Sequence, residues 1–159
     1  AGTLWAGVAY LRDNFSAAAS GNKIASASVN WDATTAAKLV LNWTQSKAYV
    51  AADTRSRNDM VQTGLLYKLT QPLSVGVMYG HSKTKNAANL AGKMQQYGGG
   101  FAYNLSRRTE LYGIASYVTS DGSTGTAYSS TPGIGAPASA LRSSDDSQLV
   151  LKAGMRHSF

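Results

Sequence analysis

Apolar side chains recur at every second position along most of this chain. The segments 61–69, 73–79 and 97–105 each alternate large apolar residues with glycine or with polar residues. Successive side chains of a β-strand point to opposite faces, so each segment would have one apolar face and one small or polar face. The longest aliphatic runs, such as 39–41, are far shorter than the roughly 20 apolar residues that a membrane helix needs. The pattern therefore predicts strands, either in water or across a membrane.

The alternation predicts an all-β fold of about eight strands, each near the length of about 9–11 residues that a tilted membrane strand needs. Tyrosine, valine, threonine and tryptophan, which favour strands, recur in these segments. The predicted strands are 3–12, 23–32, 37–48, 59–69, 73–84, 94–105, 109–119 and 146–159.

The predicted connections alternate between short and long. The short ones are 33–36, 70–72 and 106–108, and the longer ones, rich in Ser, Asn, Asp and Gly, are 13–22, 49–58, 85–93 and 120–145. This alternation places all the long loops on one side of the sheet. It is typical of an antiparallel up-and-down transmembrane β-barrel with short periplasmic turns. We expect residues 1–159 to form one such barrel segment, with 120–145 as a long external loop.

Aromatic residues fall into two groups along the predicted strands. The group near the short turns comprises Trp31, Trp43, Tyr67, Tyr103 and Phe159. The group nearer the long loops comprises Tyr10, Tyr79 and Tyr117. Two such rings match the aromatic girdles at the two interfaces of a membrane barrel. A soluble β-sandwich is the alternative, and the regular order of long and short loops disfavours it.

Two segments resemble a known family. The hairpin 101–113 contains a Tyr-x-Leu-Ser-Arg-Arg-Thr-x-Leu-Tyr sequence that is similar to one in the general-diffusion porins of beta-proteobacteria. The end of the chain also resembles the end of those porins, and reads Gly154-Met155-Arg156-His157-Ser158-Phe159. A terminal Phe with alternating apolar or amphipathic residues looks like the assembly signal of outer-membrane barrels. Its residues here are Phe159, His157, Met155, Ala153 and Leu151.

The resemblance implies a trimeric, 16-stranded, water-filled barrel in the outer membrane of a Gram-negative bacterium. It also implies contact with the lipid bilayer, with lipopolysaccharide and with the barrel-assembly machinery. This chain has about half of the strands, and it lacks the family's opening strand and constriction loop. We therefore interpret it as the C-terminal half of such a porin, to which no constriction arginine can be transferred.

The inward face of the predicted strands is mainly cationic. We expect the pore-lining residues to be Lys38, Lys68, Lys152 and Arg156, with Glu110 as the one acid away from loops and turns. Several cations packed without partners in a filled eight-stranded interior would be costly. Inward glycines would also leave a small barrel underfilled. Both features favour one wall of a large pore over a small closed eight-stranded barrel with a structural or adhesion role.

Other classes of function find little support in the sequence. There is no cysteine, and neither His81 nor His157 has a partner at ligand spacing, so we expect no metal and no cofactor. No Gly-x-Ser-x-Gly motif occurs, and we do not expect an enzyme. The basic residues are scattered along the strands, which disfavours nucleic-acid binding. The sequence predicts passive diffusion of small hydrophilic solutes, and the net charge of +7 predicts a preference for anions.

Overall fold

A computed structural model of the chain describes residues 2–15, 20–50, 53–86, 91–122 and 146–159. These residues form eight strands, as the alternation predicted. The described residues contain no helix that is long and apolar enough to cross a membrane. The strands are β1 (Leu4–Phe15), β2 (Ser20–Asp32), β3 (Ala37–Val50), β4 (Asp53–Lys68), β5 (Leu73–Asn86), β6 (Ala91–Asn104), β7 (Thr109–Gly122) and β8 (Ser147–His157).

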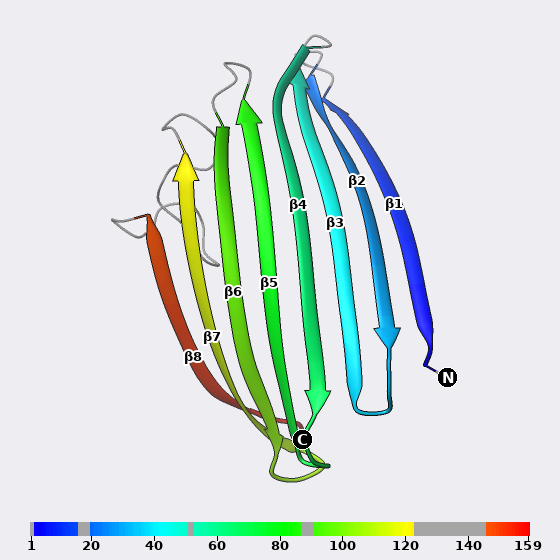
Figure 1. Cartoon of the computed structure of the whole chain (residues 1–159), viewed down its shortest axis with the longest axis vertical. Coiled ribbons are helices and arrows are strands. Elements are labelled where there is room, and N and C mark those ends of the chain that lie inside the picture. The colour runs from blue at the N-terminus through cyan, green and yellow to red at the C-terminus, as the bar shows by residue number, and fades with distance from the viewer. Residues whose placement is uncertain (1, 16–19, 51–52, 87–90, 123–145) are drawn as a thin grey trace.

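All eight strands belong to one sheet in which each strand pairs with its neighbours along the chain, always antiparallel. Figure 1 shows the sheet as a curved wall with β1 at one edge and β8 at the other. Among the described residues β1 pairs only with β2, and β8 only with β7. The all-β, up-and-down prediction is therefore confirmed, and the alternative of a closed eight-stranded barrel does not fit this open sheet.

β8 is shorter than the predicted 146–159 at both ends, whereas β1 to β7 are longer than predicted at one end of the sheet. We call this end the rim end, and the opposite end, with 33–36, 69–72 and 105–108, the short-turn end. At the rim end the connections between strands are short. They are 16–19 between β1 and β2, 51–52 between β3 and β4, and 87–90 between β5 and β6. The connection between β7 and β8 is longer. These extensions could not be recognised from the sequence. Most residues there are polar on both faces of the strand, so hydrophobicity shows no period of two.

The predicted external loop 120–145 begins inside a strand. Ser120 and Asp121 belong to β7, which runs to Gly122. Residues 123–145 lie outside the described residues.

The register separates the side chains into two faces. Directly paired residues point to the same side, so one row of pairs joins Leu39 to Leu65, Leu65 to Val77, and so on to Leu151. We call the side that carries this row the apolar face and the other side the polar face. The most buried side chains all lie on the polar face: Ser82, Thr84, Ser116, Val118 and Ser120.

The polar face is the concave one. A hollow of about 540 Å³ lies over it, and its lining includes the polar-face residues Val40, Leu66, Met78, Gln96, Ile114 and Lys152. These residues come from β3 to β8, so their side chains can line one hollow only if the sheet curves toward them. The apolar face is therefore convex, and it is the exposed one: Val77 is 60% exposed and Leu151 is 73% exposed.

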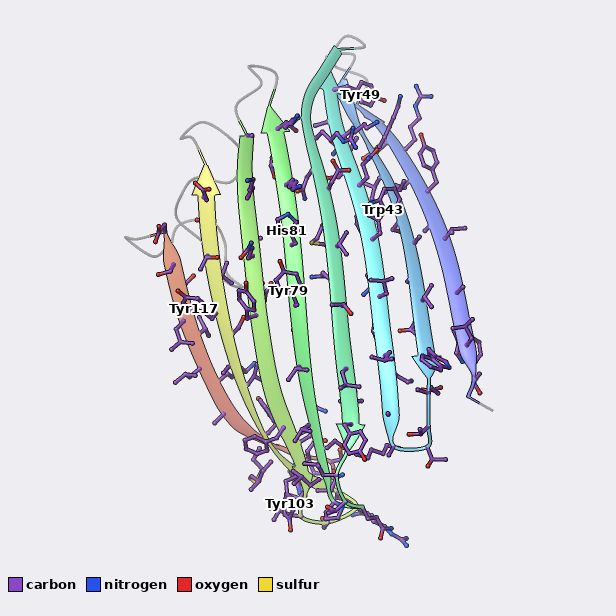
Figure 2. The ribbon with its side chains drawn as sticks, viewed as in Figure 1. Trp43, Tyr49, Tyr79, His81, Tyr103 and Tyr117 are labelled. Carbon is purple, nitrogen blue, oxygen red and sulfur yellow. The ribbon has the colours of Figure 1, made fainter. Side chains whose placement is uncertain are left out.

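Aromatic rings bound the apolar residues of the convex face. On β6 they are Tyr97 and Tyr103, which are six residues apart, or about 20 Å of strand. Tyr97 packs against Tyr79 with ring centroids 5.2 Å apart. Trp43 departs from our expectation, because it lies midway along β3, toward the rim end, and not at the turn 33–36 (Figure 2). It thus belongs with the rim-end rings.

Two adjacent leucines provide a test of the two faces. Leu65 lies on the convex apolar face and Leu66 on the concave polar face, with similar exposures of 37% and 45%. Leu65→Arg should lower the free energy of unfolding by roughly 2–4 kcal/mol, because it places a cation in the hydrocarbon. Leu66→Arg should cost little, because its guanidinium reaches water. Urea titration of the protein folded in vesicles measures both, and the reverse order would mean that the faces are exchanged.

Candidate pore wall

The five predicted pore-lining residues all lie on the concave polar face: Lys38, Lys68, Glu110 and Arg156 near its short-turn end, and Lys152 at the middle of β8. Glu110 pairs with Arg156 across β7 and β8, and Lys152 lies opposite Ile114. On the other side of the wall Lys38 lies opposite Leu66, and Lys68 lies opposite Ser74. The structure thus places the charges as two groups, one on β3 and β4 and one on β7 and β8.

Two of the four cations have an acidic partner. The Arg156 guanidinium lies 3.4 Å from a Glu110 carboxylate oxygen. The Lys38 ammonium lies 3.3 Å from a carboxylate oxygen of Asp32, which is the residue directly opposite on β2. Asp32 is the last residue of β2, directly before the turn 33–36, and it lies on the same concave face as Lys38. The sequence analysis did not include it among the inward acids. Continued alternation from Asn30 was the signal for its inward direction.

Lys152 and Lys68 carry most of the uncompensated positive charge. Neither makes an ion pair within the described part of the chain. The Lys152 ammonium lies 5.9 Å from the ring centroid of Tyr112, a distance at which the ring attracts a cation. The Tyr112 ring lies over Gly154, its cross-strand partner, where an added Cβ would come within 2.6 Å of the phenol oxygen. Gly154 thus gives the ring its place beside Lys152.

The rim half of the polar face consists mainly of uncharged, hydrogen-bonded side chains. The Asn58 side-chain oxygen accepts hydrogen bonds from the hydroxyls of Ser82 (2.6 Å) and Thr84 (3.1 Å). Gln96 donates to the Ser116 hydroxyl at 3.1 Å. Further hydroxyls and amides on this face belong to Ser26, Ser28, Asn30, Asn42, Thr44, Ser46 and Gln62.

Charge is scarce in the same rim half. Of the strand side chains that the structure describes there, Asp13 alone is charged. The sequence analysis missed this separation by height, because the height of a residue depends on the register of its strand.

The predicted assembly-signal residues lie on the opposite face. Leu151, Ala153, Met155 and His157 share the apolar face of β8. Phe159 is fully exposed, and its ring makes a T-shaped contact with the His157 ring, with the two centroids 4.9 Å apart. The Nδ1 atom of His157 lies 2.9 Å from the Thr109 hydroxyl oxygen. The described residues contain no group of three His, Cys, Asp or Glu that would hold a metal ion.

Comparisons with known proteins agree with this geometry. The family model for Gram-negative porins matches residues 1–123. No curated protein matches the chain. Among solved structures, an anion-selective porin from Comamonas acidovorans superposes with a TM-score of 0.77 at 22% identity, over 99% of this chain and 45% of that porin. The chain thus spans less than half the length of that porin.

The fold and the match to the family model together assign the chain to a family. The match covers most of the chain, and the sheet has the apolar convex face and polar concave face of a membrane barrel wall. The chain belongs to the Gram-negative porin family and is an integral part of the bacterial outer membrane.

Proposed function

We propose that this chain is one wall of a water-filled channel for the passive diffusion of small hydrophilic solutes. The observation that carries the proposal is the open, curved sheet with its polar face on the concave side. The unpaired outer sides of β1 and β8 would leave backbone donors and acceptors unsatisfied in lipid. We infer that further strands close the barrel, to 16 in the resemblance drawn from the sequence.

The side chains of the concave face suit a wide lumen. A barrel of eight strands has an interior that side chains just fill. Here glycines, serines and amides cover much of the face, and these are too small to fill it. In a wider barrel the same groups contact water, so solutes are excluded by size and need no binding step. This mechanism requires no catalytic group and no cofactor.

We further propose that the channel prefers anions. Of the four predicted inward cations, Lys68 and Lys152 have no acid beside them in the described residues, whereas Lys38 and Arg156 are each beside an acid. Charges in a water-filled lumen act over about 10 Å at 0.1 M salt, so they raise the local anion concentration without binding anions tightly. The similar porin from Comamonas acidovorans is described as anion-selective, which supports the proposal.

Reversing the charge at Lys68 and Lys152 should weaken or reverse the preference of the channel for anions. In Lys68→Glu, Lys152→Glu the reversal potential under a KCl gradient should move toward cation preference, and the shift should shrink as salt rises. Planar bilayers provide the measurement. A wild-type channel that prefers cations would contradict the proposal, because other parts of the barrel would then control the field.

Removing the partner of Lys38 should act in the opposite direction. Asp32→Asn leaves the Lys38 ammonium uncompensated in the lumen, so the reversal potential should move further toward anion preference. Asp121→Asn is the matched control, because Asp121 lies on the convex face opposite Lys93. Equal shifts in the two variants would show that total charge, and not lumen charge, sets the selectivity.

The exposed end of β8 supports a role in assembly. We propose that the barrel-assembly machinery recognises Phe159 together with His157, Met155, Ala153 and Leu151, which share the apolar face. Deleting Phe159 should reduce the amount of protein in the outer-membrane fraction several-fold and leave it in the periplasm or degraded. Unchanged membrane levels on fractionation would contradict this role.

The remaining partners follow the family resemblance. We propose that the closed barrel forms a homotrimer in the lipid bilayer, with lipopolysaccharide around it and 123–145 on the outside of the cell.

A further inference from the structure

The hollow on the concave face is apolar, although it lies on the polar side of the sheet. Its volume of about 540 Å³ is within the range of about 300–1,000 Å³ that is typical of small-molecule sites. Three of its side chains, Leu66, Met78 and Ile114, are between 37% and 48% exposed. Val40 and Val150 extend the apolar lining on β3 and β8. The hollow therefore offers an apolar surface to solutes on the concave side.

Glycines give the hollow its depth. Its floor on β5 and β6 contains Gly76, Gly98 and Gly100, and Gly76 lies directly opposite Gly100. The Leu66 side chain reaches to 3.4 Å from the place where a Cβ of Gly76 would lie. The Met78 side chain lies over Gly98, where an added Cβ would come within 2.6 Å of it. The floor is thus lower than the tips of the surrounding side chains, so a compact group fits there.

One cation lies at the edge of the hollow. Lys152 is the one charged side chain among the described residues that line it. It lies directly opposite Ile114, and the ion pairs of the described residues do not include it. Toward the rim end the lining contains Gln96 and Ser116, which are hydrogen-bonded to each other at 3.1 Å. The hollow thus combines an apolar surface with one positive charge, and these two features together suit an amphipathic anion.

We propose that the hollow binds monocarboxylates with a compact apolar body, such as an aromatic ring, on their way through the channel. The apolar body contacts Leu66, Met78 and Ile114, and the carboxylate lies beside the Lys152 ammonium. A single negative charge suffices, because Lys68, the other predicted inward cation without an acid beside it in the described residues, lies outside the hollow. Chloride reaches the same ammonium but gains nothing from the apolar surface. The proposal rests on the proposed function in one respect, namely that the concave face lines the lumen.

Three small probes separate the two features of the hollow. Benzoate has a ring and a charge, acetate has the charge without the ring, and benzamide has the ring without the charge. Their binding to the closed barrel in detergent is measured by saturation-transfer NMR titration at neutral pH. We expect benzoate to bind on the order of tenfold more tightly than acetate, because each buried CH₂ contributes about a factor of four and the half-covered ring buries the equivalent of about two. Benzamide should bind about fivefold more weakly than benzoate, which is the contribution of an exposed ion pair.

A variant that fills the floor tests the apolar surface. In Gly76→Val the added Cβ has its nearest neighbours at 3.4 and 3.5 Å, which is ordinary contact, and benzoate should then bind no more tightly than acetate. Gly7→Val is the matched control, since Gly7 lies opposite Ser28 on the same face but outside the hollow, and it should bind benzoate like the unmodified protein. Leu66→Gln tests the same surface without added bulk, and it should weaken benzoate binding about fourfold.

A pair of lysine variants tests the charge. Lys152→Gln should weaken benzoate binding about fivefold and leave benzamide binding unchanged. Lys68→Gln is the charge-matched control, because Lys68 lies on β4, four strands from β8 at about 4.8 Å per strand. At about 0.15 M salt that separation exceeds the screening length of roughly 8 Å, so Lys68→Gln should have a much smaller effect. Equal weakening by the two variants would overturn the proposal, since the total charge of the lumen would then hold the anion.

Equal binding of benzoate and acetate by the unmodified protein would also overturn the proposal. It is the result expected if a segment from the rest of the barrel covers the hollow. The KCl conductance of the unmodified protein in planar bilayers separates this outcome from the fate of the proposed channel. A barrel that conducts but does not prefer benzoate to acetate contradicts the binding proposal alone, and a barrel that prefers benzoate but does not conduct contradicts the channel alone.

Discussion

The hydrogen-bonding needs of the backbone govern this structure. Lipid offers no partner for an N–H or C=O group, so a chain without a long apolar run can cross it only as strands that pair with other strands. The eight described strands meet that requirement with one another, except along the two outer edges of the sheet. Once the strands are paired, the period of two assigns every second side chain to lipid and the others to the concave side.

The chemical character of each face of the sheet also changes along the strand direction. The same alternation that separates lipid from lumen continues beyond the aromatic rings, but the convex face changes there from aliphatic to cationic. On the concave face the distribution is the opposite, with most charges toward the short-turn end and hydroxyls and amides toward the rim end. The net charge of +7 is therefore a poor guide to the charge of the concave face.

The sequence predicted the fold well, because its main signal is local. Alternation and turn residues gave eight antiparallel strands and the correct faces for Lys38, Lys68 and Lys152. The strand ends at the rim were missed, since polar residues on both faces leave no hydrophobic period. Asp32 was missed because its role depends on which residue lies opposite, and this is a property of register and not of composition. The basic residues that lie opposite one another at the rim end of the convex face, such as Lys23, Lys47 and Arg57, were hidden for the same reason, as they are far apart in the chain.

The long pairing at the rim end has a consequence for how such a wall can vary. β3 and β4 remain paired from the short turn to Val50 and Asp53, with one shift of register between Ala48 and Tyr49, so a long ladder joins the rim end to the membrane-spanning part. Such a ladder isolates the tip mechanically, because a change of sequence there alters neither the register below it nor the faces that the register defines. Under the proposed orientation, the surface that the rim end presents to the outside of the cell could then change in sequence while the faces of the wall below it stay the same.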